Sequence, residues 1–345
     1  MAAQLLKTLL KQQISILKKR KENRGFTILE LLVATLIATM VIVVLLNMVV
    51  DLLQTDRREY ARNETQREMQ MALDYMVNDI REAAYVYDNI ELNDVRTFLK
   101  LPTGFTPILA FWKPETFSDQ TLNPLGNCSQ FGTDAVKRPE CDQLIVRRRA
   151  FSLVVYLQKQ NDSNDQRDGW KGISRITRYQ LNKYTQNGIT NLDKTTGYVD
   201  PQENTVTFAS WPRIASSDSS NPRGGSVATG AGQGLAVGAD QVLVDFVDFP
   251  TTNRTDNLTP PQTPVCPGTN YSRIPTDSTF NSPSFMVCVS TNNTFNSGAD
   301  SSNTNQDVLI FLRGNPTGKA GVKIAPLLAV KTQAVARGVV NKQPQ

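Results

Sequence analysis

The hydrophobic pattern of the chain starts with one long apolar segment. From Phe26 to Val50, 25 residues carry a single charge, that of Glu30. A helix of this length rises by ~1.5 Å per residue and can cross the ~30 Å hydrocarbon layer of a membrane. We therefore expect a transmembrane helix over residues 26–50. Because a lone carboxylate is costly in lipid, we expect Glu30 to have a function and a partner.

After Val50 the pattern becomes that of an amphipathic helix. Neither Gly nor Pro occurs between Phe26 and Leu101. An apolar stripe recurs at spacings of three and four residues. Its members are Met69, Leu73, Met76, Ile80, Ala83 or Ala84, and Tyr87. We expect the helix to continue from residue 51 toward a far boundary at Leu101, with roughly 60 helical residues in all, and to lay this stripe on a sheet of the same chain. A protein-binding face is the alternative.

From Phe105 onward the apolar positions alternate with a period of two, which is typical of strands. The expected strands are Gln143–Val146, Phe151–Gln158, Gly172–Leu181, Thr205–Ala209, Gln241–Phe249, Phe285–Ser290 and Asp307–Arg313. No second long helical pattern lies between them, which excludes a repeating strand–helix–strand plan. We expect an α+β fold, with the long N-terminal helix packed on a mainly antiparallel sheet and residues 102–345 forming one β-rich domain.

Three other interpretations of the apolar segment fit less well. A signal peptide would have a shorter apolar core followed by a small-x-small cleavage site, and neither is present. A buried core helix is rarely apolar on every side over such a length. A plain signal anchor fits the length and the flanking charges, but it leaves the pattern Gly25-Phe26-Thr27 followed by Glu30 unexplained.

Residues 25–34 read GFTILELLVA, and this motif resembles the class III signal of type IV pilins and type II secretion pseudopilins. The resemblance implies that residues 1–25 are a leader, which a prepilin peptidase removes by cutting after Gly25. Phe26 then becomes the N-methylated first residue of the mature chain. Glu30 would pair with the amine of residue 26 in a neighbouring subunit. Many members bend their helix at a proline, where this chain has Asn47, so we expect a straighter helix.

The leader has the charge expected of a cytoplasmic segment. Residues 1–25 contain seven Lys or Arg and one Glu, and such an excess stays in the cytoplasm by the positive-inside rule. The resemblance therefore implies a single-pass protein of the bacterial inner (cytoplasmic) membrane, with its C-terminal domain outside. Its partners would be the peptidase, other pilins or pseudopilins contacted through the N-terminal helix, and an inner-membrane assembly platform.

The leader also accounts for the basic character of the chain. The net charge is +5, and the leader supplies +6 of it, so the side chains of the mature chain sum to −1. We therefore expect no nucleic-acid partner. The short run Arg147-Arg148-Arg149 is expected to lie on a solvated strand.

Cysteine usage points to disulfides. The four cysteines are Cys128, Cys141, Cys266 and Cys288, and no C-x-x-C pair occurs. A zinc site of four widely spaced thiolates is the less favoured alternative, since the domain is expected outside the cytoplasm. Three connectivities are formally open. Proximity in the sequence favours Cys128–Cys141 and Cys266–Cys288.

Enzyme classes find little support in the sequence. The chain has no histidine, which removes the usual general base and every Ser-His or Cys-His pair. No phosphate-binding loop motif occurs either. Asp162, Asn164, Asp165 and Asp168 are closely spaced oxygen ligands, but they lack the rhythm of a calcium loop. We expect a solvated turn there, and we expect no catalysis, no cofactor and no metal.

Three segments rich in Ser, Thr, Asn and Gly are expected to be flexible loops, at residues 215–240, 251–283 and 291–306. The favoured function is a structural one, as a minor pilin or pseudopilin at the tip or priming complex of a fibre that supports secretion or motility. Residues 64–87 and the strand at 241–249 are similar to those of J-type pseudopilins and PilW-like minor pilins. The alternative is a tip-displayed adhesin that recognises a surface, a polysaccharide or DNA.

Overall fold

The structure is a computed structural model of the chain. It describes residues 26–185, 188–203, 205–216, 223–232, 234–249, 258, 264–276, 283–291 and 306–336. The chain divides into two units, Met1–Asp56 and Arg57–Gln345. The predicted leader, including Gly25, lies outside the described residues.

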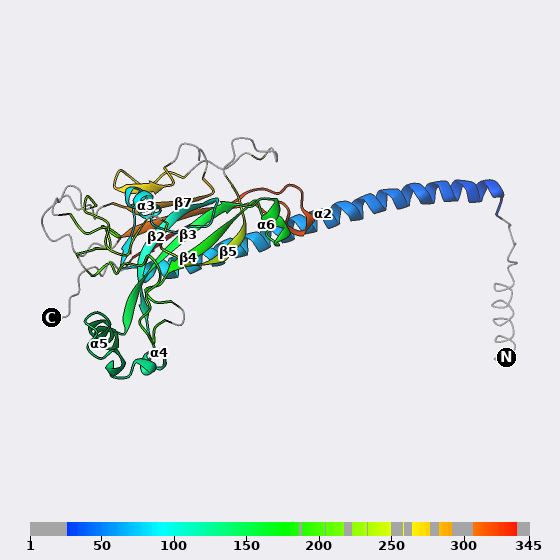
Figure 1. Ribbon diagram of the computed structural model, residues 1–345. Coiled ribbons are helices and arrows are strands. Elements are labelled where there is room, and N and C mark those ends of the chain that lie inside the picture. Colours follow the sequence, from blue (N-terminus) through cyan, green and yellow to red (C-terminus); the bar gives the residue numbers. More distant parts are fainter. Residues whose placement is uncertain are drawn as a thin grey trace, which may run out of the picture. The chain divides into compact units, whose positions relative to one another are not determined.

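Helix α2, Ile28–Arg81, contains 54 residues and runs through Asn47 without a break (Figure 1). The prediction that the helix extends to Leu101 is wrong, because it ends at Arg81. Beyond it, the Ala84 backbone N–H donates to the Trp112 carbonyl oxygen at 2.7 Å. The apolar residues after Arg81 keep helical spacing, and no Gly or Pro follows before Leu101. Backbone pairing with the sheet nevertheless ends the helix.

The described residues of the second unit form an antiparallel sheet of nine strands. The strands are β1 (Tyr85–Val86), β2 (Phe105–Thr116), β3 (Arg149–Gln160), β4 (Ser174–Leu181), β5 (Ala239–Val247), β6 (Tyr271–Ile274), β7 (Phe285–Ser290), β8 (Asp307–Gly314) and β9 (Leu328–Val335). Their order is β1-β2-β3-β4-β5-β8-β7-β6, and β9 also pairs with β8. The predicted α+β fold with an antiparallel sheet is confirmed.

Short helices connect the strands. They are α3 (Asn89–Val95), α4 (Asp119–Leu122), α5 (Lys137–Arg147) and α6 (Ser163–Arg167), with 3₁₀ turns η1 (Asn123–Leu125), η2 (Ser129–Phe131) and η3 (Lys319–Gly321). Helix α3 begins at a capping box, in which the Asp88 carboxylate accepts from the Glu91 backbone N–H at 2.8 Å. Residues 117–149, which contain α4, η1, η2 and α5, are called the arm below.

Two predicted strands are wrong. Gln143–Val146 lies in α5, where Cys141 and Leu144 point one buried face inward at helical spacing. Thr205–Ala209 forms turns: Thr205 has a φ of 62°, and the Trp211 N–H donates to the Thr207 carbonyl oxygen at 2.9 Å. A left-handed residue of this kind interrupts an extended strand.

Three sizeable strands, β2, β6 and β9, lie outside the predicted set. Strand β2 contains a run of six buried residues, so it shows no alternation, and Pro107 and Pro114 weaken its sequence signal. Strand β9 does alternate, because Leu328 and Ala334 are buried while Lys331 and Gln333 are exposed. Its period of two was a usable signal.

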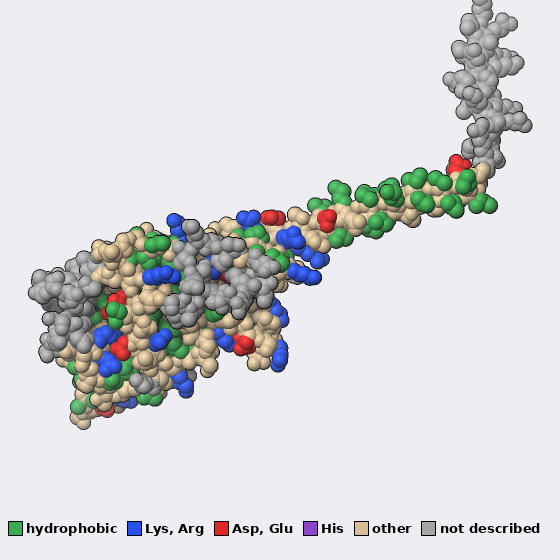
Figure 2. All heavy atoms as spheres, turned by 90° about the horizontal axis from the view of Figure 1, so that it is seen from above, with side chains coloured by type: hydrophobic (Ala, Val, Ile, Leu, Met, Phe, Trp, Pro, Cys, Tyr) green, Lys and Arg blue, Asp and Glu red, His purple; other side chains and the backbone are tan. Residues whose placement is uncertain are grey.

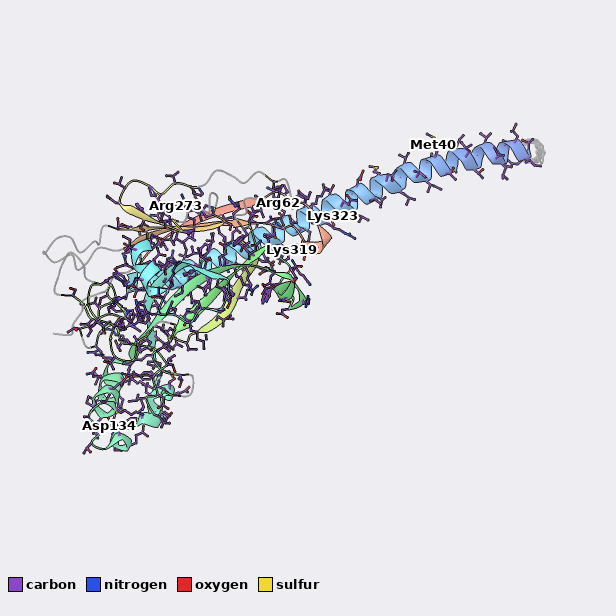
Figure 3. All side chains as sticks on the ribbon, turned by 45° about the horizontal axis from the view of Figure 1, so that its top comes forward. Met40, Arg62, Asp134, Arg273, Lys319 and Lys323 are labelled. Atoms are coloured by element: carbon purple, nitrogen blue, oxygen red, sulfur yellow. A yellow bond between two sulfur atoms is a disulfide. The ribbon has the colours of Figure 1, made fainter. Side chains whose placement is uncertain are left out.

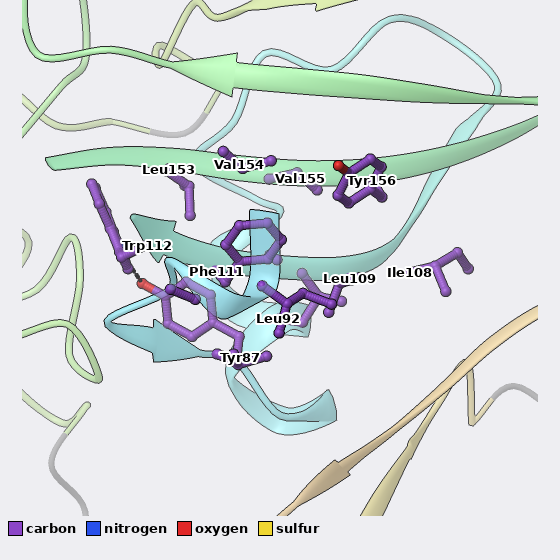
Figure 4. Close-up of a cluster of buried hydrophobic side chains, with 14 of the residues drawn as sticks. Tyr87, Leu92, Ile108, Leu109, Phe111, Trp112, Leu153, Val154, Val155 and Tyr156 are labelled. Carbon is purple, nitrogen blue, oxygen red and sulfur yellow. Dashed lines mark hydrogen bonds between the residues drawn. The ribbon is translucent and has the colours of Figure 1, made fainter. Parts of the chain in front are cut away.

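The C-terminal part of α2 packs on the sheet over an aromatic core. The Trp112 indole N–H donates to the Tyr87 hydroxyl at 2.7 Å (Figure 4). Trp112 also meets Trp211 edge to face. The helix comes close to Gly314 of β8, where an added Cβ would lie 3.0 Å from Thr65 Cγ2. Glycine at this position therefore lets the helix reach the strand.

Two of the three segments predicted to be flexible loops contain residues with defined contacts. In residues 215–240, Ala228 and Ala236 are buried, and the Tyr179 hydroxyl donates to the Ala236 carbonyl oxygen at 2.6 Å. In residues 251–283, Tyr271–Ile274 forms β6. The flexibility of the three segments stays a prediction. Most of 251–270 and the stretch 292–305 lie outside the described residues.

Candidate processing and assembly site

Thr27 begins the helix at the predicted processing site. Its Oγ1 accepts a hydrogen bond from the Glu30 backbone N–H at 3.2 Å, and its carbonyl oxygen accepts from the Leu31 N–H at 3.1 Å. A threonine that caps a helix in this way satisfies a donor that would otherwise lack a partner. The sequence reasoning gave Thr27 no role, although a threonine three residues before a glutamate is a known capping signal.

Glu30 lies in the first turn of α2. A carboxylate at this position interacts favourably with the positive end of the helix dipole. No cation among the residues that the structure describes pairs with Glu30. Phe26 is 76% exposed, two residues before the helix. The site therefore presents an aromatic residue and a carboxylate one helical turn apart, both accessible to another chain.

The N-terminal part of α2 is apolar and exposed on every side. Its most apolar 18-residue segment has a mean hydropathy of 2.8, and none of that segment is buried. Hydrophobic side chains follow this part of the helix in Figure 2, and Met40, labelled in Figure 3, is 70% exposed. By length and composition, α2 is able to cross a membrane.

The two hydroxyls inside this apolar stretch are internally satisfied. Thr35 Oγ1 donates to the Leu32 carbonyl oxygen, and Thr39 Oγ1 donates to the Leu36 carbonyl oxygen, each at 2.9 Å. Because lipid offers no hydrogen-bond partner, these bonds make both side chains compatible with a hydrocarbon environment. The polar group that remains without such an internal solution is the Glu30 carboxylate, which is the one charged group between Phe26 and Val50.

Residues 20–46 match the family model of the prokaryotic N-terminal methylation motif. The match supports a type IV pilin-like family. This family is structural rather than enzymatic, and its motif implies processing by a prepilin peptidase and assembly with other pilins. The motif and the single apolar helix are consistent with a membrane-anchored pilin. No curated protein and no solved structure matches the chain.

In the pilin-like head, one carboxylate anchors α2 to the sheet. Asp79 of α2 is buried and accepts from Lys113 of β2, Tyr156 of β3 and Arg178 of β4, at 2.7–2.8 Å. Burial alone would raise the pKa of Asp79, but the hydrogen bonds from Arg178 and Lys113 lower it. Sequence reasoning considered only the apolar residues of this stripe and missed Asp79, since a lone Asp on a helix gives no signal of its partners.

Both expected disulfides are present. Cys128 is bonded to Cys141 and Cys266 to Cys288, with Cα–Cα distances of 5.8 and 5.6 Å. The first closes the arm around a small apolar cluster that includes Leu125 and Leu144. A bridge over such a short loop stabilises by about 2–3 kcal/mol.

A buried lysine connects the arm to the rest of the head. The Lys183 ammonium lies 2.9 Å from Glu140 of α5, 2.8 Å from Asp200 and 3.2 Å from Glu203. Burial alone would lower the pKa of Lys183, but the surrounding carboxylates, Asp200 foremost, raise it. The ammonium is therefore charged and neutralises part of this acidic cluster.

The acidic stretch at 162–168 is not the predicted solvated turn. Asp162 caps α6, and the buried Asp165 accepts from Lys159 and Arg175, each within 2.8 Å. Although burial opposes it, the Arg175 hydrogen bond holds the pKa of Asp165 well below its usual range. These oxygens are therefore used in ion pairs and helix capping.

The basic run at 147–149 does not lie along one strand as predicted. Arg147 ends α5, Arg148 has a φ of 52° and pairs with Asp119 at 2.7 Å, and Arg149 begins β3. A left-handed residue between a helix and a strand turns the chain. The three residues therefore lie in a helix end, a turn and a strand start, and they do not form one basic stripe along a strand.

Proposed function

We propose that this chain is a structural subunit of a type IV pilus or a secretion pseudopilus. A prepilin peptidase cuts after Gly25, and Phe26 becomes the N-methylated first residue of the mature chain. The observation that carries the proposal is the methylation motif at residues 20–46, which runs into the exposed apolar N-terminal part of α2. Such a helix can leave lipid only by packing against other apolar helices, because water would not solvate it.

Glu30 sets the position of each subunit in this proposal. Its carboxylate pairs with the positive amine of residue 26 in a neighbouring subunit. In a medium of low dielectric, a subunit placed out of register would leave both charges buried and unpaired, which is strongly unfavourable. The apolar packing supplies the affinity, and this one ion pair supplies the register.

The large head favours a minor subunit at the tip or in the priming complex, of the J-type. The described residues of the unit Arg57–Gln345 include a nine-stranded sheet and the arm of residues 117–149. A head of this size is hard to accommodate at every step of a thin fibre. The chain would then start or cap a fibre that supports secretion or motility, with the inner-membrane assembly platform as a further partner.

The test uses the native host, with the wild-type gene replaced by Glu30→Val and, as a matched control, by Met40→Leu. Glu30→Val should be processed but should be absent from purified fibres, while Met40→Leu should be incorporated at the wild-type level.

Deletion of the gene should abolish fibres or secretion. Incorporation of Glu30→Val at the wild-type level would contradict the role of Glu30. Immunogold label along the whole fibre would contradict the minor-subunit role, and intact fibres that fail to adhere would favour an adhesin.

A further inference from the structure

Strand β5 has one edge without a partner strand over most of its length. On one side it pairs with β4 from Ala239 to Val247. On the other side it meets β8 at a single pair, Val247 and Gly314. No strand among the described residues pairs with the second edge between Ala239 and Asp245. Ala239, Asp240 and Gln241 at the start of this edge are exposed.

A bulge at Phe246 separates β5 from β8. Phe246 has a φ of 59°, and the register of β5 against β4 shifts beside it. Such a bulge bends a strand and ends its pairing. Gly172 approaches this bulge closely, since an added Cβ there would lie 2.3 Å from the Phe246 nitrogen. The Gly172 N–H in turn donates to the Asp245 carboxylate at 3.0 Å, so the bend is held in place.

An apolar groove of about 410 Å³ lies between this strand and helix α2. Met71, Ala72 and Tyr75 line it from the helix, and Leu243 and its neighbours line it from β5. Met71 is 52% and Tyr75 46% exposed. Large apolar side chains that flank an open strand edge are typical of interaction sites.

The two charged residues that line the groove, Glu68 and Asp245, are acidic, and Asp240 lies further along β5. The cations beside the groove, Lys319 and Arg178, are paired with Glu68 and Asp79. Glu68 is neutralised by Lys319, 2.6 Å away and visible beside α2 in Figure 3. Asp240 and Asp245 form no ion pair with any cation in the described part of the chain. An occupant that brings a Lys or Arg would therefore be favoured over a neutral or acidic one.

We propose that the β5 edge and this groove receive an edge strand from the head of a neighbouring pilin-like subunit. The strand adds antiparallel to β5, places alternate apolar side chains against Met71 and Tyr75, and brings a Lys or Arg to Asp240. The row of unpaired backbone donors and acceptors selects a polypeptide strand over a small ligand, because a strand satisfies them in register. This inference rests on the proposed function, since it requires assembly beside other subunits.

The test places the photoreactive residue p-benzoylphenylalanine at Leu243 of the full-length chain in its native host. The matched control carries it at Val136, a residue of the arm that is 67% exposed. Irradiation should give an adduct from position 243, and not from 136, with another chain that has the N-terminal methylation motif. The crosslinked peptide should contain a strand with Lys or Arg. No adduct, equal adducts from both positions, or adducts with only a second copy or with unrelated proteins would overturn the proposal.

A second variant tests the charge. Asp240→Lys should reduce the adduct from position 243 about tenfold, because like charges would then meet. Asp142→Lys, on the exposed face of α5, should leave the adduct unchanged. An unaltered adduct in Asp240→Lys would overturn the charge argument. On the same samples, the N-terminal residue and the presence of the chain in fibres are measured. A processed chain found in fibres without the adduct contradicts this inference alone.

Discussion

Asp79 on helix α2 and Arg178 on strand β4 are joined by a 2.7 Å hydrogen bond between Oδ2 and Nε. Lys113 and Tyr156 bind the same carboxylate from two further strands. Asp79 therefore connects helix α2 to three neighbouring strands of the head, β2, β3 and β4. In a subunit that is held in a fibre by its helix, this anchor would carry force between the helix and the head.

Asp79→Asn should lower the free energy of unfolding of the head by about 3 kcal/mol, because Arg178 then loses its carboxylate partner in a largely buried site and Lys113 keeps only the exposed Glu82. Urea unfolding of the full chain in detergent, followed by tryptophan fluorescence, measures this change. Asp74→Asn is the control, since Asp74 is exposed on the same helix. Equal shifts of the urea midpoint in both variants would contradict the anchor.

Glu91 should make stability depend on pH. Burial, reinforced by the nearby Asp88, raises the pKa of Glu91 from 4.5 to about 7. The folded state thus holds a proton on Glu91 that the unfolded chain has already lost. This contribution to stability is fully present below pH 4.5 and is lost as the pH rises to about 7.

Glu91→Gln removes this titration. The difference in unfolding free energy between Glu91→Gln and wild type should therefore move in favour of the variant from pH 5 to pH 8. Urea midpoints at several pH values measure the difference, and Asp74→Asn again serves as the control. A difference that stays constant across this range would show that Glu91 keeps an ordinary pKa.

Loss of the Cys128–Cys141 bridge should loosen the arm and leave the sheet intact. The double variant Cys128→Ala/Cys141→Ala should lose about 2–3 kcal/mol locally, so limited proteolysis should cut within residues 117–149 first. The matched control, Cys266→Ala/Cys288→Ala, should be cut outside the arm. Identical cleavage patterns for the two variants would contradict a local role.

Much of the fold was predictable because its strongest signals are local. Phe26–Val50 is apolar without interruption, and Phe285–Ser290 was predicted with the bounds that the structure shows. The predictions were wrong where contacts with residues distant in the sequence determine the secondary structure. The end of α2 at Arg81 is set by pairing of the following residues with β2, and β2 itself is buried on both faces. Neither fact is visible in a single stretch of sequence.

The functional and anchoring residues also differ in how far the sequence identifies them. Glu30 stands out because it is the one charge in an apolar run. Asp79 and Asp165 do not stand out, because their partners Arg178 and Arg175 are brought near by the sheet. Ala236 likewise lies in a stretch of loop-like composition, yet it is buried through contacts with Tyr179 and Lys100. Composition alone gives no information about such contacts.

The most direct test of the account is mass spectrometry of the N-terminus of the protein isolated from its native host. The account predicts a mature chain that begins at N-methylated Phe26, with residues 1–25 absent. Gly25→Leu should keep the leader and should not enter fibres, because a side chain at this position hinders close approach of the peptidase. A wild-type chain that still begins at Met1, or at any residue other than methylated Phe26, would contradict the account.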